Sequence, residues 1–177
     1  LNNPDFDTDA MGWTPGSVAG MAPMVSYQPA GTYNGGSALI TPQDASPDRI
    51  LMTNDAILSI TAGQVYEVSG YVATTTGTIN LRASLHQNGN IANLYSDRVA
   101  ETYATNSGRV FKLYLTASTT AADAQFSLET SNQNVAYEID SVSVRRVSAL
   151  TKNTNTIEVL ILSNTGTTNA DIVCPGG

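Results

Sequence analysis

Charge is scarce in this sequence, and positive charge is the scarcer sign. Charged residues make up 13% of the 177 residues, with 8 Lys and Arg against 15 Asp and Glu, whereas an average domain carries about 25%. The formal net charge is −7 and the pI is about 4.4, so the phosphate backbone of a nucleic acid would be repelled. Nucleic acid is therefore not an expected partner.

Cysteine and long apolar runs are also nearly absent. Cys174 is the only cysteine, so no disulfide can form within the chain, and the cysteine count does not distinguish the cytoplasm from the exterior. The longest apolar run covers residues 159–162 and is far too short to cross a bilayer, which takes about 20 residues. A membrane is therefore not an expected partner either.

Helix signals are nearly missing, and strand signals take their place. No long segment has a period of 3.6 residues, whereas short alternating runs recur between clusters of Gly, Asn, Asp and Thr. The predicted strands cover residues 56–61, 65–73, 78–86, 109–116, 124–130 and 136–147. Short antiparallel strands at this spacing are typical of an all-β sandwich or jelly roll.

The strand pattern predicts one module over residues 1–148 and a separate segment over residues 149–177. A polar connector at 151–156 leads into strand-like runs at 156–164 and 170–174. We expect this segment either to pack on the sandwich or to begin a next module. The abrupt start and the final "CPGG" are typical of a module excised from a longer protein.

Three stretches carry a resemblance to a known family. They are "NNPDFDTDAMGWTP" (residues 2–15), "ITAGQVYEVSGYVATTTGTINLRASL" (60–85) and "AQFSLETSNQNVAYEIDSVSV" (124–144). In this order they resemble the opening, middle and closing motifs of carbohydrate-binding modules of the family 4, 9, 16 and 22 type. The resemblance implies a galactose-binding-like jelly-roll β-sandwich of two antiparallel sheets, with a concave ligand-binding face.

The resemblance also implies a structural calcium ion. Its ligands would be Asp7, after the opening Phe, and Asp140 of the closing motif, with Asp5 where a carbonyl ligand is expected. Carboxylate and carbonyl oxygens are the donors that calcium prefers. The alternative is that these aspartates are a solvated, acidic strand start.

Two strand faces are predicted to form the carbohydrate-binding groove. In family 4 modules an Arg and the Asn of a Gln-Asn-Gly turn face the sugar, and the matching residues are Arg82 and Asn88. Strand periodicity adds Ser84 to the first face and puts Gln125 and Glu129 together on a second face. Such side chains can bind paired sugar hydroxyls; the alternative is two ordinary solvated strand faces.

The stacking aromatics of the family are missing at their usual positions. Gly16 and Ala92 stand where family 4 modules carry rings, so we expect Tyr71 or Tyr95 to stack on the sugar instead. Otherwise Tyr71 is a rim residue and Tyr95 anchors a loop.

Trp13, the only tryptophan, is expected to pack beneath the sheet rather than to bind ligand. The loop at residues 43–55 is another candidate wall of the groove, with Arg49 and Asn54 as its polar ends.

Catalysis is not expected. Glycoside hydrolysis requires two carboxylates across the bond, and Glu129 is the one acid that the pattern places in the groove. His86, the only histidine, shares a strand face with Ser84. Side chains two residues apart on a strand point in parallel, which is not the geometry of a nucleophile and its base. His86 is either solvated or a contact at the groove's edge.

The resulting hypothesis is a non-catalytic, monomeric module that holds a polysaccharide chain, such as a β-glucan, xylan or related plant or algal glycan. It would target an attached glycoside hydrolase or similar enzyme, in a protein that is secreted by or displayed on a bacterium. The alternative is an adhesion or domain-packing module that binds protein.

Overall fold

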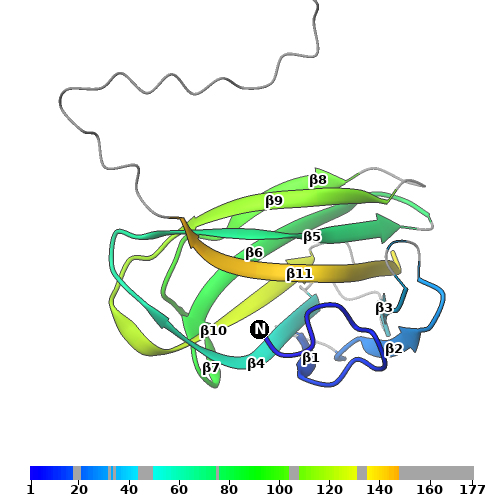
Figure 1. Cartoon of the computed structure of the whole chain (residues 1–177), viewed down its shortest axis with the longest axis horizontal. Coiled ribbons are helices and arrows are strands. Elements are labelled where there is room, and N and C mark those ends of the chain that lie inside the picture. Colours follow the sequence, from blue (N-terminus) through cyan, green and yellow to red (C-terminus); the bar gives the residue numbers. More distant parts are fainter. Residues whose placement is uncertain are drawn as a thin grey trace, which may run out of the picture.

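Two antiparallel sheets make up the computed structural model, which describes residues 1–17, 21–31, 33, 35–43, 50–74, 76–103, 108–130 and 135–147 (Figure 1). In the six-stranded sheet the order is β1 (Trp13–Ser17), β4 (Ile50–Ile60), β10 (Ala121–Thr130), β6 (Ile79–Gln87) and β7 (Asn90–Leu94), and β8 (Val99–Tyr103) also pairs with β6. In the five-stranded sheet the order is β2 (Met24–Gln28), β3 (Ser37–Thr41), β11 (Tyr137–Val147), β5 (Val65–Thr74) and β9 (Arg109–Thr116).

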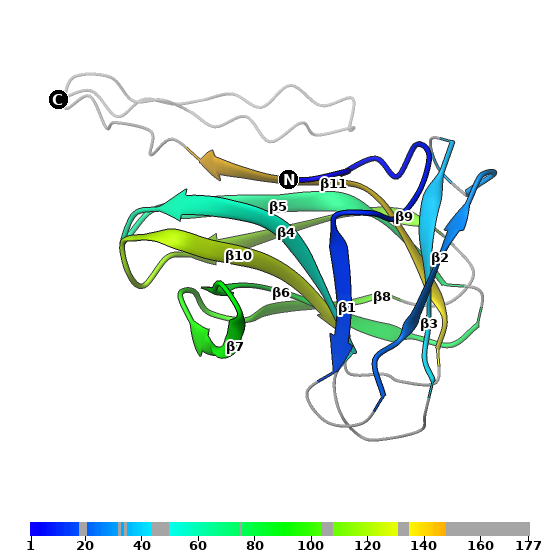
Figure 2. The ribbon, with the colours of Figure 1, turned by 90° about the horizontal axis from the view of Figure 1, so that it is seen from below.

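The predicted all-β sandwich of two antiparallel sheets is confirmed. Figure 2 shows the two layers and the strong curl of the six-stranded sheet. No helix occurs among the residues just given, and therefore none there has the length and apolar character of a membrane span. The predicted segment at 149–177, including its strand-like runs and Cys174, lies outside the described residues.

Strand alternation explains how the core is filled. On β6 and β10 every second residue is a buried apolar side chain that points between the sheets. These residues are Ile79, Leu81, Ala83, Leu85, Ala124, Phe126 and Leu128. The alternation of residues 78–86 in the sequence predicts Ile79, Leu81, Ala83 and Leu85 on the inward face, and the structure confirms this.

The sequence pattern located the long strands and missed the short ones. β9 has its predicted bounds, and β5, β6 and β11 agree within a residue at either end. β4 begins at Ile50, well before the predicted start at Ala56. β1 was not predicted because Pro15 and Gly16 are disfavoured in strands, although an edge strand tolerates them.

The opening segment, residues 1–12, ties the two sheets together. The backbone N–H of Val142 on β11 donates to the Pro4 carbonyl, and the N–H of Asp55 on β4 donates to the Gly12 carbonyl. Figure 2 shows this segment running beside β11 before it enters β1. The segment thus spans from one sheet to the other and fixes the edge formed by β1 and β4.

Two aromatic rings anchor this segment in the core. Phe6 is fully buried and has a φ of 48°, a left-handed conformation that is unusual for a bulky residue. Its ring lies 5.6 Å from that of Trp13, which in turn meets Phe126 edge-on at 6.2 Å. Trp13 is 5% exposed, and its Nε1 donates to the Asn3 carbonyl. The prediction that Trp13 belongs to the core is confirmed.

A buried carboxylate joins three strands on the outer face of the five-stranded sheet. Glu67 on β5 accepts hydrogen bonds from Arg145 Nε on β11 (2.8 Å) and from Tyr114 Oη on β9 (3.1 Å), and Lys112 Nζ lies 3.4 Å away. Burial raises the pKa of the Glu67 carboxyl, but hydrogen bonds from these three partners lower it more, so the pKa lies below its ordinary value.

Replacement Glu67→Gln should lower the free energy of unfolding at pH 7 by about 2 kcal/mol, because the partners lose a charged acceptor. A lowered carboxyl pKa contributes stability that is fully present above the unfolded value of 4.5 and is lost as the pH falls through the folded value. In chemical denaturation, the free energies of unfolding of the wild type and Glu67→Gln should therefore differ at pH 7 and differ much less at pH 3. Asp97→Asn removes an exposed carboxylate and is the control; an equal gap at both pH values would contradict this account.

Candidate functional site

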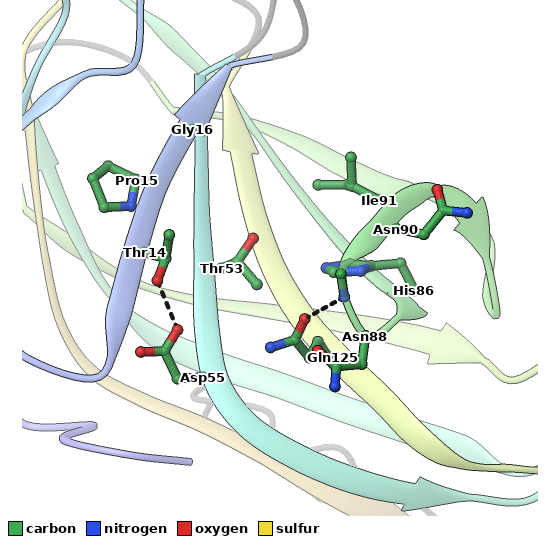
Figure 3. A pocket seen from close by; sticks show the side chains of 11 residues that line it. Thr14, Pro15, Gly16, Thr53, Asp55, His86, Asn88, Asn90, Ile91 and Gln125 are labelled. Carbon is green, nitrogen blue, oxygen red and sulfur yellow. Dashed lines mark hydrogen bonds between the residues drawn. The ribbon is translucent and has the colours of Figure 1, made fainter.

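An open cleft of about 420 Å³ lies on the outer face of the curled sheet, away from the core (Figure 3). Strands β1, β4, β6, β7 and β10 and the β6–β7 turn contribute to it. Its lining residues are Thr14, Pro15, Gly16, Thr53, Asp55, His86, Asn88, Gly89, Asn90, Ile91 and Gln125. Three of the predicted groove residues, His86, Asn88 and Gln125, are thus brought together.

Hydrogen bonds fix both walls of the cleft. On one side Thr14 Oγ1 on β1 donates to Asp55 Oδ1 on β4 at 2.8 Å (Figure 3). On the other side the Gly89 N–H donates to Gln125 Oε1 at 3.2 Å. Gly89 has a φ of 70°, which the tight Asn88-Gly89 turn requires. The exposed Asn88 side chain is therefore held at the rim.

Three strands contribute one side chain each to a chain of hydrogen bonds at the floor. Thr53 Oγ1 on β4 lies 2.8 Å from Ser127 Oγ on β10, and Ser127 Oγ lies 2.7 Å from His86 Nε2 on β6. His86 Nδ1 lies 2.8 Å from the Gln87 carbonyl. Burial lowers the pKa of His86, and the Gln87 carbonyl opposes this shift. The partner of His86 is thus Ser127 across the sheet, and not Ser84 on its own strand.

Glu129 and Ser84 point to the same side of the sheet as the residues that line the cleft, but both are fully buried. Ser84 Oγ donates to Glu129 Oε1 at 3.2 Å, and Arg98 Nε pairs with the same oxygen at 3.3 Å. The predicted face is right, but the exposure expected for Ser84 and Glu129 is wrong. Neighbouring side chains cover them, Glu129 being paired with Arg98. Arg82, the register neighbour of Glu129, is half-buried.

The remaining predicted contacts lie away from the cleft. Tyr71 is on β5 in the other sheet, where its ring stacks on Tyr33 at 4.4 Å. Tyr95 packs against the core and donates from its hydroxyl to Asp123, as a loop anchor would.

Asn54, one of the two polar ends of the predicted loop wall, does not face the cleft. Asn54 is fully buried, and its side chain bonds the backbone of Asn2. Its neighbours Thr53 and Asp55 point the other way and line the cleft. Arg49 lies outside the described residues.

Aromatic side chains are absent from the cleft lining in the described part of the chain. Gly16 does line the cleft, at the position where family 4 modules carry a ring, and Ala92 does not. The lining side chains that were not predicted are Thr14, Pro15, Asn90 and Ile91, and Thr53 and Asp55 fall in the loop at 43–55 that was predicted as a wall. Alternation through β4 would have paired Thr53 with Asp55, had the strand been predicted to start at Ile50.

The predicted calcium ligands lie on two elements: Asp5 and Asp7 are in the opening segment, and Asp140 is on β11, beside which that segment passes. Asp140 is fully buried, and its Oδ1 accepts the Ser141 N–H at 2.6 Å. Asp5 and Asp7 are exposed at the surface. A Cβ on Gly36 would collide with the Phe6 carbonyl oxygen, so these backbones are in close contact.

Where the opening segment passes β11, Asp140 offers a buried carboxylate, and oxygen donors of this kind suit calcium. The nearby carbonyls of Pro4 and Asp7 accept hydrogen bonds from the Val142 N–H and from Tyr27 Oη. Across the described ranges, no three Asp, Glu, His or Cys side chains gather as a metal site. Any ion here would therefore depend on backbone carbonyls.

Solved structures share this fold. The arabinose-bound α-L-arabinofuranosidase matches with a TM-score of 0.69 at 13% identity, over 82% of this chain and 26% of that chain. The xylan-binding domain CBM22-1 of Xyn10C from Paenibacillus barcinonensis matches with a TM-score of 0.57 at 18% identity, over 82% and 92% of the two chains. A family 4 carbohydrate-binding module matches with 0.58 at 19% identity, over 82% and 99%.

These matches confirm the predicted β-sandwich of the carbohydrate-binding-module type as a fold. The chain spans only about a quarter of the arabinofuranosidase. No protein-family model and no curated protein matches the sequence.

Replacement Glu129→Ala should lower the free energy of unfolding by about 2 kcal/mol, because Ser84 and Arg98 lose their buried acceptor. Urea denaturation at pH 7 measures the effect. Arg82→Ala is the matched control from the same face, with an expected loss below about 1 kcal/mol because its side chain is only half-buried. Equal stability of the wild type and Glu129→Ala would show that the buried pair does not hold this face together.

Proposed function

We propose that this chain is a non-catalytic carbohydrate-binding module that holds a polysaccharide chain in the cleft between β1 and the β6–β7 turn. The observation that carries the proposal is the cleft itself, which is open and lined by hydroxyl, amide and carboxylate groups. It is supported by a fold shared with a domain described as xylan-binding.

The polar groups of the cleft match the chemistry of sugars. A sugar hydroxyl both donates and accepts, and Gln125 and Asn88 offer side-chain groups of both kinds. Thr14 donates its hydrogen to Asp55 and so offers only an acceptor oxygen. Asp55 accepts only, and its charge favours hydrogen bonds from paired hydroxyls. Ile91 and Pro15 add apolar surface for the C–H faces of the sugar.

The charges favour an uncharged glycan. Asp55 is the only Asp, Glu, Lys or Arg among the described lining residues. The whole chain carries a net charge of −7, which would repel a polyanionic polysaccharide. Neutral xylans or β-glucans are therefore the first ligands to test.

The same residues argue against hydrolysis. Glycoside hydrolysis needs two carboxylates on either side of the bond, and Asp55 is the one carboxylate that lines the cleft among the described residues. Ser127 and His86 lie at hydrogen-bond distance, but Ser127 is fully buried and cannot reach a substrate. The module would serve an attached enzyme by keeping it near its substrate, in a protein exported by a bacterium.

Affinity electrophoresis against a panel of xylans, β-glucans and galactans tests the proposal. Asp55→Ala and Gln125→Ala should each weaken retention by the retained glycan about tenfold, which corresponds to one charged or well-aligned hydrogen bond. Thr116→Ala, on the exposed face of β9 in the other sheet, is the control and should bind like the wild type. A wild-type protein that no glycan retards would contradict the proposal and favour a module that binds protein.

We further propose a structural calcium ion at the crossing of the opening segment with β3 and β11. Asp140 would be the buried carboxylate ligand, and carbonyls of the opening segment near Asp5 and Asp7 would complete the shell. A bound ion would supply a cross-link between the first and the last segments of the module.

Chelation should reveal this ion in thermal denaturation. EDTA should lower the Tm of the wild type by about 5 °C, because an ion bound only to the folded state stabilises it. Without EDTA, Asp140→Asn should already have the lowered Tm that the wild type shows with EDTA. Adding EDTA should then not change the Tm of this variant. Asp97→Asn, an exposed carboxylate elsewhere, should respond like the wild type. Identical melting with and without EDTA would contradict the calcium proposal.

A further inference from the structure

The hydrogen-bond chain at the cleft floor has one open end. Ser127 is fully buried and His86 is 2% exposed, so neither finds water as an alternative partner. Thr53 is half-buried and lines the cleft. The hydrogen-bond chain therefore runs from the Gln87 carbonyl through His86 and Ser127 to the Thr53 hydroxyl, which faces the cleft.

The number of available hydrogens fixes which atom donates and which accepts in each of these hydrogen bonds. A carbonyl only accepts, so the hydrogen between His86 and Gln87 belongs to His86 Nδ1. In a neutral imidazole the other nitrogen, Nε2, then carries none and must accept from the Ser127 hydroxyl. Ser127 has only that one hydrogen. In the 2.8 Å contact between the two hydroxyls, Thr53 must therefore be the donor.

We propose that Thr53 is a specificity-determining residue of the cleft that acts toward the ligand only as a hydrogen-bond acceptor. Its single hydrogen is committed to Ser127, so it presents only lone pairs to the bound sugar. It would select a glycan that places a free hydroxyl, rather than an ether oxygen, against the floor. This inference rests on the proposed function of the cleft.

Protonation of His86 would reverse the chain. With hydrogens on both ring nitrogens, His86 donates to Ser127 Oγ, and the hydrogen of Ser127 must turn to Thr53 Oγ1. The hydrogen of Thr53 would then point into the cleft. Acidification thus converts the floor from an acceptor into a donor, and a ligand fitted to the acceptor would lose one hydrogen bond.

Charged groups around His86 influence the pH at which the hydrogen bonds reverse direction. Glu129 on β10 favours the protonated ring, and Arg98, between β7 and β8, opposes it. Asp55 on β4 lines the same cleft, and Arg82 lies on the same face of β6. Burial has the largest effect and lowers the pKa of His86 from 6.5, so the acceptor form holds at neutral pH.

The first experiment needs no ligand. His86 is the only histidine, so its ring nitrogens are assigned without ambiguity in a ¹⁵N-labelled sample. Long-range ¹H–¹⁵N correlation at pH 7.5 should show the Nδ1–H tautomer, with Nε2 as the bare nitrogen. In Ser127→Ala the same tautomer should persist, because the Gln87 carbonyl still fixes it. A wild-type ring protonated at Nε2 would overturn the inference, whatever the cleft binds.

The second experiment measures affinity for the retained glycan between pH 4 and 8. Wild-type affinity should fall by about tenfold as the NMR signals of His86 report protonation. Ser127→Ala interrupts the hydrogen-bond chain between His86 and Thr53. The affinity of this variant should therefore not depend on pH in this way, although His86 still titrates. Thr53→Val should bind about tenfold more weakly at pH 7.5, and Thr53→Ser, which keeps the hydroxyl, should bind like the wild type.

The outcomes separate the two proposals. If Ser127→Ala follows the wild-type pH profile, protonated His86 acts on the ligand directly and the inference fails while the binding function stands. If the wild type binds no glycan, the proposed function fails, and with it the selective role of Thr53. The tautomer measurement still decides whether the chain has the stated direction.

Discussion

The outer face of β6 and β10 depends on one constraint: polar groups that are closed off from water must find hydrogen-bond partners. Ser84, Ser127, Glu129 and His86 are all buried on this face. Each is bonded to a residue of another strand or to the backbone, so the face is a connected layer rather than a solvated one. His86, one member of this layer, lines the cleft.

The walls of the cleft depend on a different part of the chain. The opening segment is tied to β11 by Pro4 and to β4 by Gly12, and its Phe6 ring is anchored in the core. It leads directly into β1, which is one wall of the cleft. The position of this wall is therefore coupled to contacts on the far side of the sandwich, where the calcium ion is proposed.

Among its described lining residues the proposed binding cleft has no Phe, Tyr or Trp, so it would select ligands differently from a cleft with stacking aromatics. An aromatic ring packs against the flat C–H face of a sugar and therefore tolerates many hydroxyl patterns. Directed groups such as Asp55, Gln125 and Thr53 instead require hydroxyls at fixed positions, since an unmatched buried polar group is costly. The expected consequence is a module that discriminates between related glycans by their hydroxyl pattern.

Alternation along the chain by itself determined the fold class and the faces of the long strands, because a strand sends successive side chains to opposite sides whatever its neighbours are. It therefore put Leu81 and Leu85 in the core and Arg82, Ser84 and His86 on the other face. Only the tertiary structure decided which faces meet, because strand order and register depend on contacts far apart in sequence. It placed Tyr71 on the other sheet and buried Glu129 beside Arg98. It also paired His86 of β6 with Ser127 of the neighbouring strand β10.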